Sequence, residues 1–172
     1  MVGFHGTTSA ASAVIETQGF LPNKVFSAHE HTQILELARA LGWNTGSYQQ
    51  WLDMRSVSFA KDPLFAIHHV TNAGNAGGQG LYNVRDALAF ILNNGSDESR
   101  AVAQAFQQKL AQLRAAAPVI YMVDLSNLGP RLVPSEVDYN MYWNPEEALP
   151  AISEIDPGRI IEKLVFAAPR EP

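Results

Sequence analysis

The chain has 172 residues, enough to enclose one full hydrophobic core and too few for two comfortable ones, so we expect a single domain over residues 1–172. Its 47% hydrophobic and 17% charged residues are typical of a soluble globular protein, and no apolar run approaches the roughly 20 residues that a membrane-spanning helix needs. The net charge of −5 disfavours broad electrostatic binding to nucleic acid, and the absence of cysteine excludes disulfides, thiolate nucleophiles and cysteine-ligated zinc.

Short strands and helices alternate in the first part of the chain. Residues 2–5 are predicted to form a strand, and residues 9–18 a helix that Gly19 ends. Apolar side chains at helical spacing predict a second helix over residues 30–41. A polar loop is expected to follow over residues 43–48.

A strand followed by a helix is predicted in the middle of the chain. Residues 55–60 alternate enough for a short strand, and Asp62 and Pro63 then begin a helix that reaches about Val70. Residues 72–80 are rich in glycine but contain no Gly-Lys-Ser/Thr pattern. We therefore expect a surface loop there rather than a phosphate-binding loop.

The second half adds two helices and the remaining strands. Helices are predicted over residues 83–93 and 97–117, and the almost continuously apolar run 118–125 predicts a strand inside a sheet. Three further short strands are predicted over residues 131–133, 148–152 and 160–167. This mixture indicates an α+β fold.

Three patterns along the chain have the composition of a ligand site. The run Phe4-His5-Gly6-Thr7 places an imidazole on a strand end, beside a glycine whose main chain can hold a flat polar ligand while the histidine bonds a hydroxyl. The second pattern is Ser58-Phe59-Ala60, which ends a strand before a helix. The third is Glu146-Glu147, with an Ile-Asp-Pro-Gly-Arg-Ile turn behind it at residues 155–160.

In this order the three patterns resemble the histidine-type branch of the ADP-ribosyltransferase superfamily, whose split β-sheet carries three short motifs. Members of that branch begin with an aromatic-His-Gly-Thr strand and a helix ending in Gly-Phe, as Phe4–Thr7 and Gly19-Phe20 do here. Their second motif ends in Tyr-Phe-Ala or a similar run, and their third is a glutamate opening a strand. We assign Glu147 rather than Glu146 because it lies nearer the predicted strand. The pair is not a Glu-x-Glu or Gln-x-Glu sequence, so the arginine-modifying branch is disfavoured.

The resemblance implies a mono-ADP-ribosyltransferase that uses NAD as co-substrate, on a split-sheet α+β fold, as the catalytic domain of a toxin or effector. Glu147 would stabilise the oxocarbenium-like state that forms when the nicotinamide bond breaks. His5 would bond the adenine-side ribose hydroxyl, Gly6 would present its main chain to the nicotinamide carboxamide, and Thr7 belongs to the same NAD-binding segment.

Other implied NAD contacts lie around the second motif. Ser58 stands where the family has a tyrosine, and Tyr48 or Tyr82 is left open as a replacement. Either Phe59 or Phe65 would stack on the nicotinamide ring. The cations expected to face the diphosphate are Arg55, Lys61 and Lys24.

The acceptor of ADP-ribose is left open between a protein and a nucleic acid, and a cognate immunity protein is an expected partner of a toxin. The alternatives are an NAD glycohydrolase, an RNA 2′-phosphotransferase and a noncatalytic binding module of the same fold. No metal is expected, since the histidines lack a consistent carboxylate partner (His29, His31, His68 and His69). No signal peptide is predicted in this chain, and secretion or delivery within a larger effector stays open.

Overall fold

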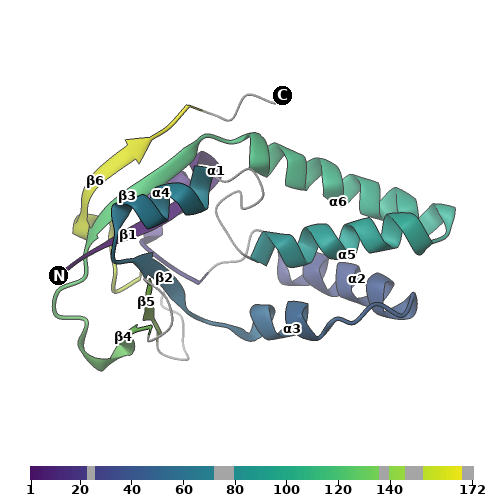
Figure 1. Ribbon diagram of the computed structural model, residues 1–172, viewed down its shortest axis with the longest axis horizontal. Helices are drawn as coiled ribbons and strands as arrows, with labels where there is room; N and C mark the ends of the chain where they lie inside the picture. Colours follow the sequence, from purple (N-terminus) through teal and green to yellow (C-terminus); the bar gives the residue numbers. More distant parts are fainter. Residues whose placement is uncertain (23–25, 72–79, 136–139, 146–152, 168–172) are drawn as a thin grey trace. The chain divides into compact units, whose positions relative to one another are not determined.

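The computed structural model describes residues 1–22, 26–71, 80–135, 140–145 and 153–167, and these form an α+β structure (Figure 1). Contacts divide the chain into two compact units. The sheet unit comprises Met1–Pro22, Arg55–Gly77 and Ala115–Pro172, and the helical unit comprises Asn23–Met54 and Gly78–Arg114. That the two units behave as one domain stays a prediction.

The sheet unit contains six strands that pair antiparallel in the order β4-β5-β2-β1-β3-β6. Their bounds are Val2–Thr8 for β1, Val57–Ala60 for β2, Pro118–Asp124 for β3, Leu132–Pro134 for β4, Asn140–Trp143 for β5 and Ile160–Val165 for β6. β3 lies inside the sheet, as its apolar sequence predicts, and pairs with β1 from Val2↔Asp124 to Thr8↔Pro118.

The two faces of the sheet are covered by different elements. On one face, which we call the core face, Phe59, Tyr121 and Trp143 form a continuous core with Ile15 of α1 (Ser9–Gln18). On the other, the α4 face, Ile120 packs with residues of α4 (Pro63–Thr71), and Figure 1 shows α4 crossing the near side of the sheet. Because strand side chains alternate between faces, odd-numbered residues of β1 point to the core face and even-numbered ones to the α4 face.

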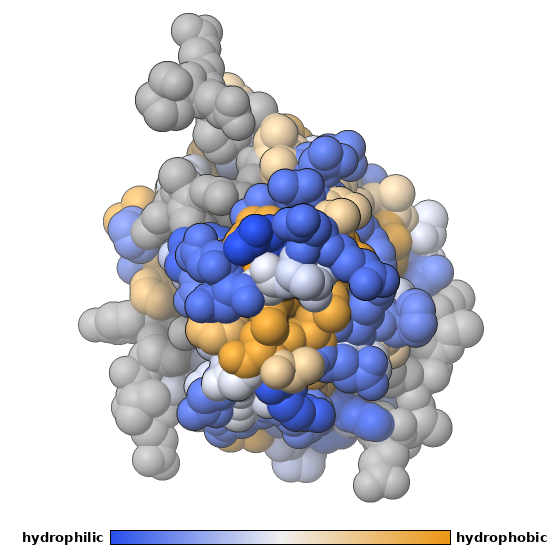
Figure 2. Space-filling view, turned by 90° about the vertical axis from the view of Figure 1, so that its right-hand side faces the viewer, coloured by the Kyte–Doolittle hydropathy of each residue, from blue (hydrophilic) through white to orange (hydrophobic). Residues whose placement is uncertain are grey.

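The helical unit consists of α2 (Ala28–Ala40), α3 (Gly46–Asp53), α5 (Gly80–Asn94) and α6 (Asp97–Ala115). α2 begins with a capping box, in which Ser27 N donates to Glu30 Oε2 at 2.7 Å and Glu30 N donates to Ser27 Oγ. Figure 2 shows an apolar area bordered by hydrophilic residues on the face that it presents. The buried positions Val84, Leu88 and Ile91 recur at helical spacing, which explains why α5 buries one face.

Most predicted elements are confirmed, but two were missed. β5 was not predicted, and α3 begins inside the segment predicted as a polar loop. The predicted strand 148–152 and the glycine-rich residues 72–79 lie outside the described residues. Among the described helices, none is both long and apolar enough to cross a membrane.

Candidate functional site

The structure brings the first two sequence motifs side by side, because β1 and β2 are neighbours in the sheet. Within the described residues a single ladder pair, Phe4↔Ala60, joins these strands, whereas β1 pairs with β3 along its whole length. The ladder between β1 and β2 therefore ends at Phe4, and we call the place where it ends, beside His5 and Gly6, the opening between β1 and β2.

The hydrogen-bond pattern of β1 shows which main-chain groups face this opening. Leu125 N donates to Met1 O at 2.9 Å, and Ser9 N donates to Ala117 O at 2.8 Å, so the odd-numbered residues bond toward β3. Alternate residues of an antiparallel strand bond to opposite sides. The N–H and C=O of Gly6 are consequently directed toward β2, at the place where the ladder stops.

His5 is fixed by β2. Its Nδ1 lies 3.0 Å from the carbonyl oxygen of Ser58, and because a carbonyl only accepts, Nδ1 must carry the proton. Burial lowers the pKa of His5 below its ordinary 6.5, with a further lowering from the charge of His69, although the bond to Ser58 opposes the shift. At pH 7 the ring is therefore neutral, and Nε2 is left as a hydrogen-bond acceptor suited to a hydroxyl.

The aromatic residues around His5 belong to the core face. The ring centroids of Phe20 and Phe59 lie 5.1 and 5.5 Å from that of His5. Phe59 has no exposed surface, so its ring is enclosed by protein rather than open to a ligand. Phe65 lies in the first turn of α4 with 36% of its surface exposed.

Gly6 is also required by the packing of α4. A Cβ atom at this position would overlap Cγ1 of Val70 and lie 3.2 Å from the carbonyl oxygen of Ala66. His69, next to Val70, is half-buried, and burial followed by the charge of His68 lowers its pKa. From the sequence, a metal-ligand role was the only one considered for His69. The four-residue spacing of Ala66 and Val70 was the signal that this helix packs one face on the sheet.

The remaining predicted site residues are dispersed. Thr7 is buried on the core face. Arg55 precedes β2 in the sequence and Lys61 follows it, and both residues are exposed. The proposed catalytic Glu147, its neighbour Glu146 and the cation Lys24 lie outside the described residues.

The two tyrosines that were left open belong to the helical unit. Tyr48 is fully buried, with its hydroxyl 2.7 Å from His31 Nδ1, and the ring of Tyr82 lies under Arg85. Within the part of the chain that the structure describes, no group of three or more histidine, aspartate or glutamate side chains is arranged to hold a metal ion.

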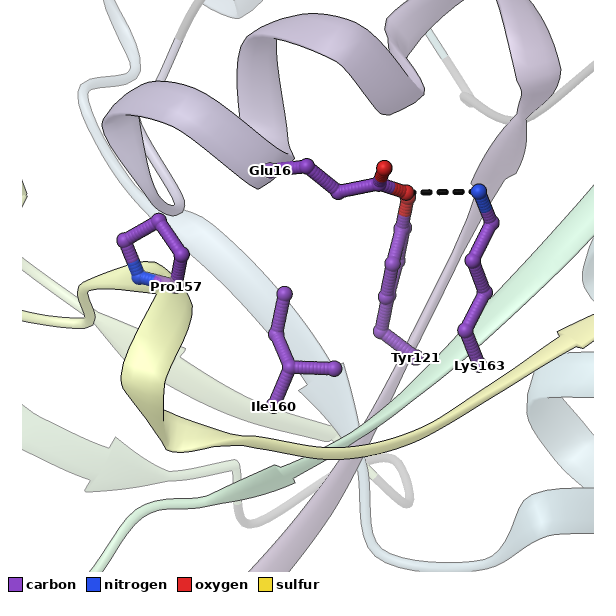
Figure 3. A pocket seen from close by; sticks show the side chains of 5 residues that line it. All are labelled: Glu16, Tyr121, Pro157, Ile160 and Lys163. Carbon is purple, nitrogen blue, oxygen red and sulfur yellow. Dashed lines mark hydrogen bonds and ion pairs between the residues drawn. The ribbon is translucent and has the colours of Figure 1, made fainter.

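A second polar cluster lies on the core face beside a hollow of about 320 Å³, lined by Glu16, Tyr121, Pro157, Ile160 and Lys163 (Figure 3). Glu16 Oε1 accepts from Tyr121 Oη at 2.7 Å and from Lys163 Nζ at 2.6 Å. Lys163, followed by Tyr121, lowers the pKa of Glu16, and burial raises the pKa of Tyr121 to about 12. These bonds tie α1 to β3 and β6, and they account for the cluster without a ligand.

Comparison with known proteins gives no match to a family model, to a curated protein or to a solved structure.

Proposed function

We propose that this chain is an NAD-dependent mono-ADP-ribosyltransferase on a split-sheet α+β fold, acting as a toxin or effector domain. The observation that carries the proposal is the opening between β1 and β2, where the main chain of Gly6 faces β2 beside a neutral, hydrogen-accepting His5. A carboxamide offers one acceptor and two donors, so it can pair with the N–H and C=O of Gly6 as a strand residue would. His5 Nε2 would accept from a ribose hydroxyl.

The reaction breaks the bond between C1′ of the ribose and the nicotinamide nitrogen, and the electron pair leaves with nicotinamide. The acceptor nucleophile forms a new bond to C1′ and loses its proton to a base or to water. Positive charge spreads over the ribose in the transition state, and a carboxylate beside it is stabilising. On the sequence resemblance we assign this carboxylate to Glu147.

The test is nicotinamide release from NAD, measured with and without cell lysate. The wild type should release nicotinamide and, in lysate, attach ADP-ribose to macromolecules. Glu147→Gln should lower the rate by about 100-fold or more, since it removes the stabilising charge. Glu162→Gln is the matched control, because Glu162 is an exposed carboxylate on β6.

The other outcomes separate the alternatives. Release without labelled macromolecules would identify a glycohydrolase, and consumption of a 2′-phosphate from RNA would identify a phosphotransferase. No release by the wild type in either condition would refute the enzyme and leave a noncatalytic module. Full activity in Glu147→Gln would reject this residue, and Glu146→Gln and Glu136→Gln would then be tested, since Glu136 precedes β5 in the sequence.

A further inference from the structure

β6 forms one border of the six-stranded sheet, and no strand among the described residues pairs with its outer side (Figure 1). The opposite border is β4, which has three residues and ends in Pro134. A short edge strand with a proline resists pairing with another chain. β6 has six residues and no proline, so it is the border that can accept a further strand.

The hydrogen bonds of β6 show which of its main-chain groups face outward. Phe166 N, directly after β6, donates to Pro118 O of β3 at 2.9 Å. Even-numbered residues at this end of the strand therefore bond toward β3, since alternate residues of an antiparallel strand bond to opposite sides. The N–H and C=O groups of Lys163 and Val165 consequently point away from the sheet.

The side chains along this border are apolar on both faces of the sheet. Ile161, Leu164 and Val165 have 52%, 44% and 59% of their surface exposed. Leu164 opposes Ile120 and projects to the α4 face, and Val165 opposes Val119 and projects to the core face. Exposed apolar side chains beside outward-directed main-chain groups favour pairing with another strand.

Lys163 is the residue on this border that would be expected to prevent such pairing. Edge strands commonly carry a lysine whose charge keeps other strands away. Here Lys163 Nζ donates to Glu16 Oε1 at 2.6 Å, and Figure 3 shows the side chain extending from β6 toward Glu16. Because Glu16 of α1 offsets this charge within the same chain, Lys163 does not repel a second copy as an unpaired lysine would.

We propose that two copies of this chain pair antiparallel along β6, with Leu164 of one copy opposite Leu164 of the other. Opposed side chains share a face of the sheet, so a two-fold axis between identical strands makes one residue face its own counterpart. If that residue were Glu162 or Lys163, like charges would oppose each other, which is destabilising. With Leu164 at the axis, Lys163 opposes Val165. Glu162 then opposes Phe166, and no two charged side chains face each other.

This register also satisfies the outward-directed main-chain groups. The N–H and C=O of Lys163 bond those of Val165 in the second copy, and the same exchange repeats across the axis. Leu164 of the two copies meet on the α4 face, at the close spacing of a pair without mutual hydrogen bonds. The two sheets become one continuous sheet. The association uses no group of the proposed NAD site, so it stands or falls independently of that proposal.

The experiment measures the oligomeric state by sedimentation velocity. The wild type should shift from monomer to dimer between about 1 µM and about 500 µM. Leu164→Lys and Leu164→Glu should each weaken dimerisation by about 30-fold or more, because like charges then face each other at the axis. An equimolar mixture of the two variants should recover the dimer, since opposite charges then meet at this position. Circular dichroism melting of each variant shows whether it is folded.

Two further variants test the edge itself. Val165→Pro removes an N–H that faces away from β3, a position at which edge strands tolerate proline, and it should abolish the dimer. Leu64→Lys is the matched control, because Leu64 is an exposed leucine of α4 with 71% of its surface accessible and does not belong to β6. This variant should dimerise like the wild type.

Three results would overturn the proposal. The first is a wild type that stays monomeric over the whole concentration range. The second is a dimer that persists in both Leu164→Lys and Leu164→Glu, because the copies would then meet through another surface. The third is a mixture of these two folded variants that remains monomeric, since residue 164 would then not face its counterpart across the axis.

Discussion

The two ring nitrogens of His5 have different roles. Nδ1 donates a hydrogen bond to the carbonyl oxygen of Ser58, and Nε2 can accept a hydrogen bond from a ligand. The sequence predicted a ligand-site histidine at a strand end, whereas β1 continues to Thr8 and His5 lies inside it. Its partner Ser58 is 53 residues away. Only the pairing of β1 with β2 shows that Nδ1 is the donor. The neutral form then follows from burial, which no sequence pattern reports.

Two substitutions of His5 test the roles of its two ring nitrogens separately. Asparagine places an N–H donor near the position of Nδ1, so His5→Asn should keep the bond to Ser58 and most of the stability while weakening NAD binding by about tenfold or more. His5→Gln places its polar group near Nε2 and should lose stability by about 1 kcal/mol through the missing bond. Calorimetry and urea unfolding measure the two effects. Equal NAD affinity in His5→Asn and the wild type would contradict the acceptor role of Nε2.

The pKa of His5 also predicts how stability depends on pH. Its pKa is lowered in the folded protein, so the unfolded chain binds the proton more readily. The free energy of unfolding should be independent of this group above pH 6.5 and should fall as the pH drops below that value. His69, whose pKa is also lowered, adds to the slope. Urea unfolding between pH 5 and 8, as a window around the ordinary histidine value, should give a smaller decrease for His5→Asn; an unchanged slope would contradict the assignment.

At the scale of elements, the packing of α4 against β1 depends on Gly6. Gly6→Ala inserts a methyl group against Val70 and should cost about 1–3 kcal/mol of stability by overpacking. The double variant Gly6→Ala, Val70→Ala should lose less than the sum of the two single changes, because the smaller side chain makes room. Urea unfolding of the four proteins measures this coupling. Strict additivity would show that the helix does not pack on Gly6 in this way.

Helical periodicity and terminal residues predicted the longer helices and the end of α1, where Gly19 has a φ of +77°. The same reasoning missed α3, because its polar sequence buries only Tyr48 fully. It missed β5 because a strand of four residues offers only Met141 and Trp143 as buried alternating positions. Tyr142 was consequently left outside any strand, and its register with Ser58 could not be foreseen.

At the scale of the whole chain, charge is divided unevenly between the two units. The sheet unit has six lysines and arginines against eleven aspartates and glutamates, a net charge of −5, whereas the helical unit has six of each sign. Two of the cations in the sheet unit are already paired, Arg131 with Glu154 and Lys163 with Glu16. The net charge of the chain is therefore concentrated on the unit that contains the candidate site.

This distribution predicts a protein acceptor rather than a nucleic acid. Phosphate backbones are repelled by an acidic surface, whereas a basic protein is attracted to it. Labelling should persist in lysate treated with nuclease and disappear in lysate treated with protease. The extent of labelling should also decrease from low salt to about 0.5 M salt, because charges are then screened beyond a few ångströms. Label that nuclease removes would contradict the prediction.

The predicted helices and strands indicated the α+β class and the length indicated one core, but neither predicted the division into two units, because contacts between distant segments decide it. The sequence predicted only part of the candidate site, because the pairing of distant strands also decides which motifs come together. Two of its motifs, at His5 and Ser58, lie on neighbouring strands, while Glu147 falls outside the described residues.

The central claim is that NAD binds at the opening between β1 and β2, and a crystal structure with a non-hydrolysable NAD analogue tests it most directly. We expect the carboxamide to bond the N–H and C=O of Gly6, and a ribose hydroxyl to donate to His5 Nε2. An analogue bound elsewhere, for example in the hollow beside Glu16 and Lys163, or no binding at millimolar concentration would contradict the claim.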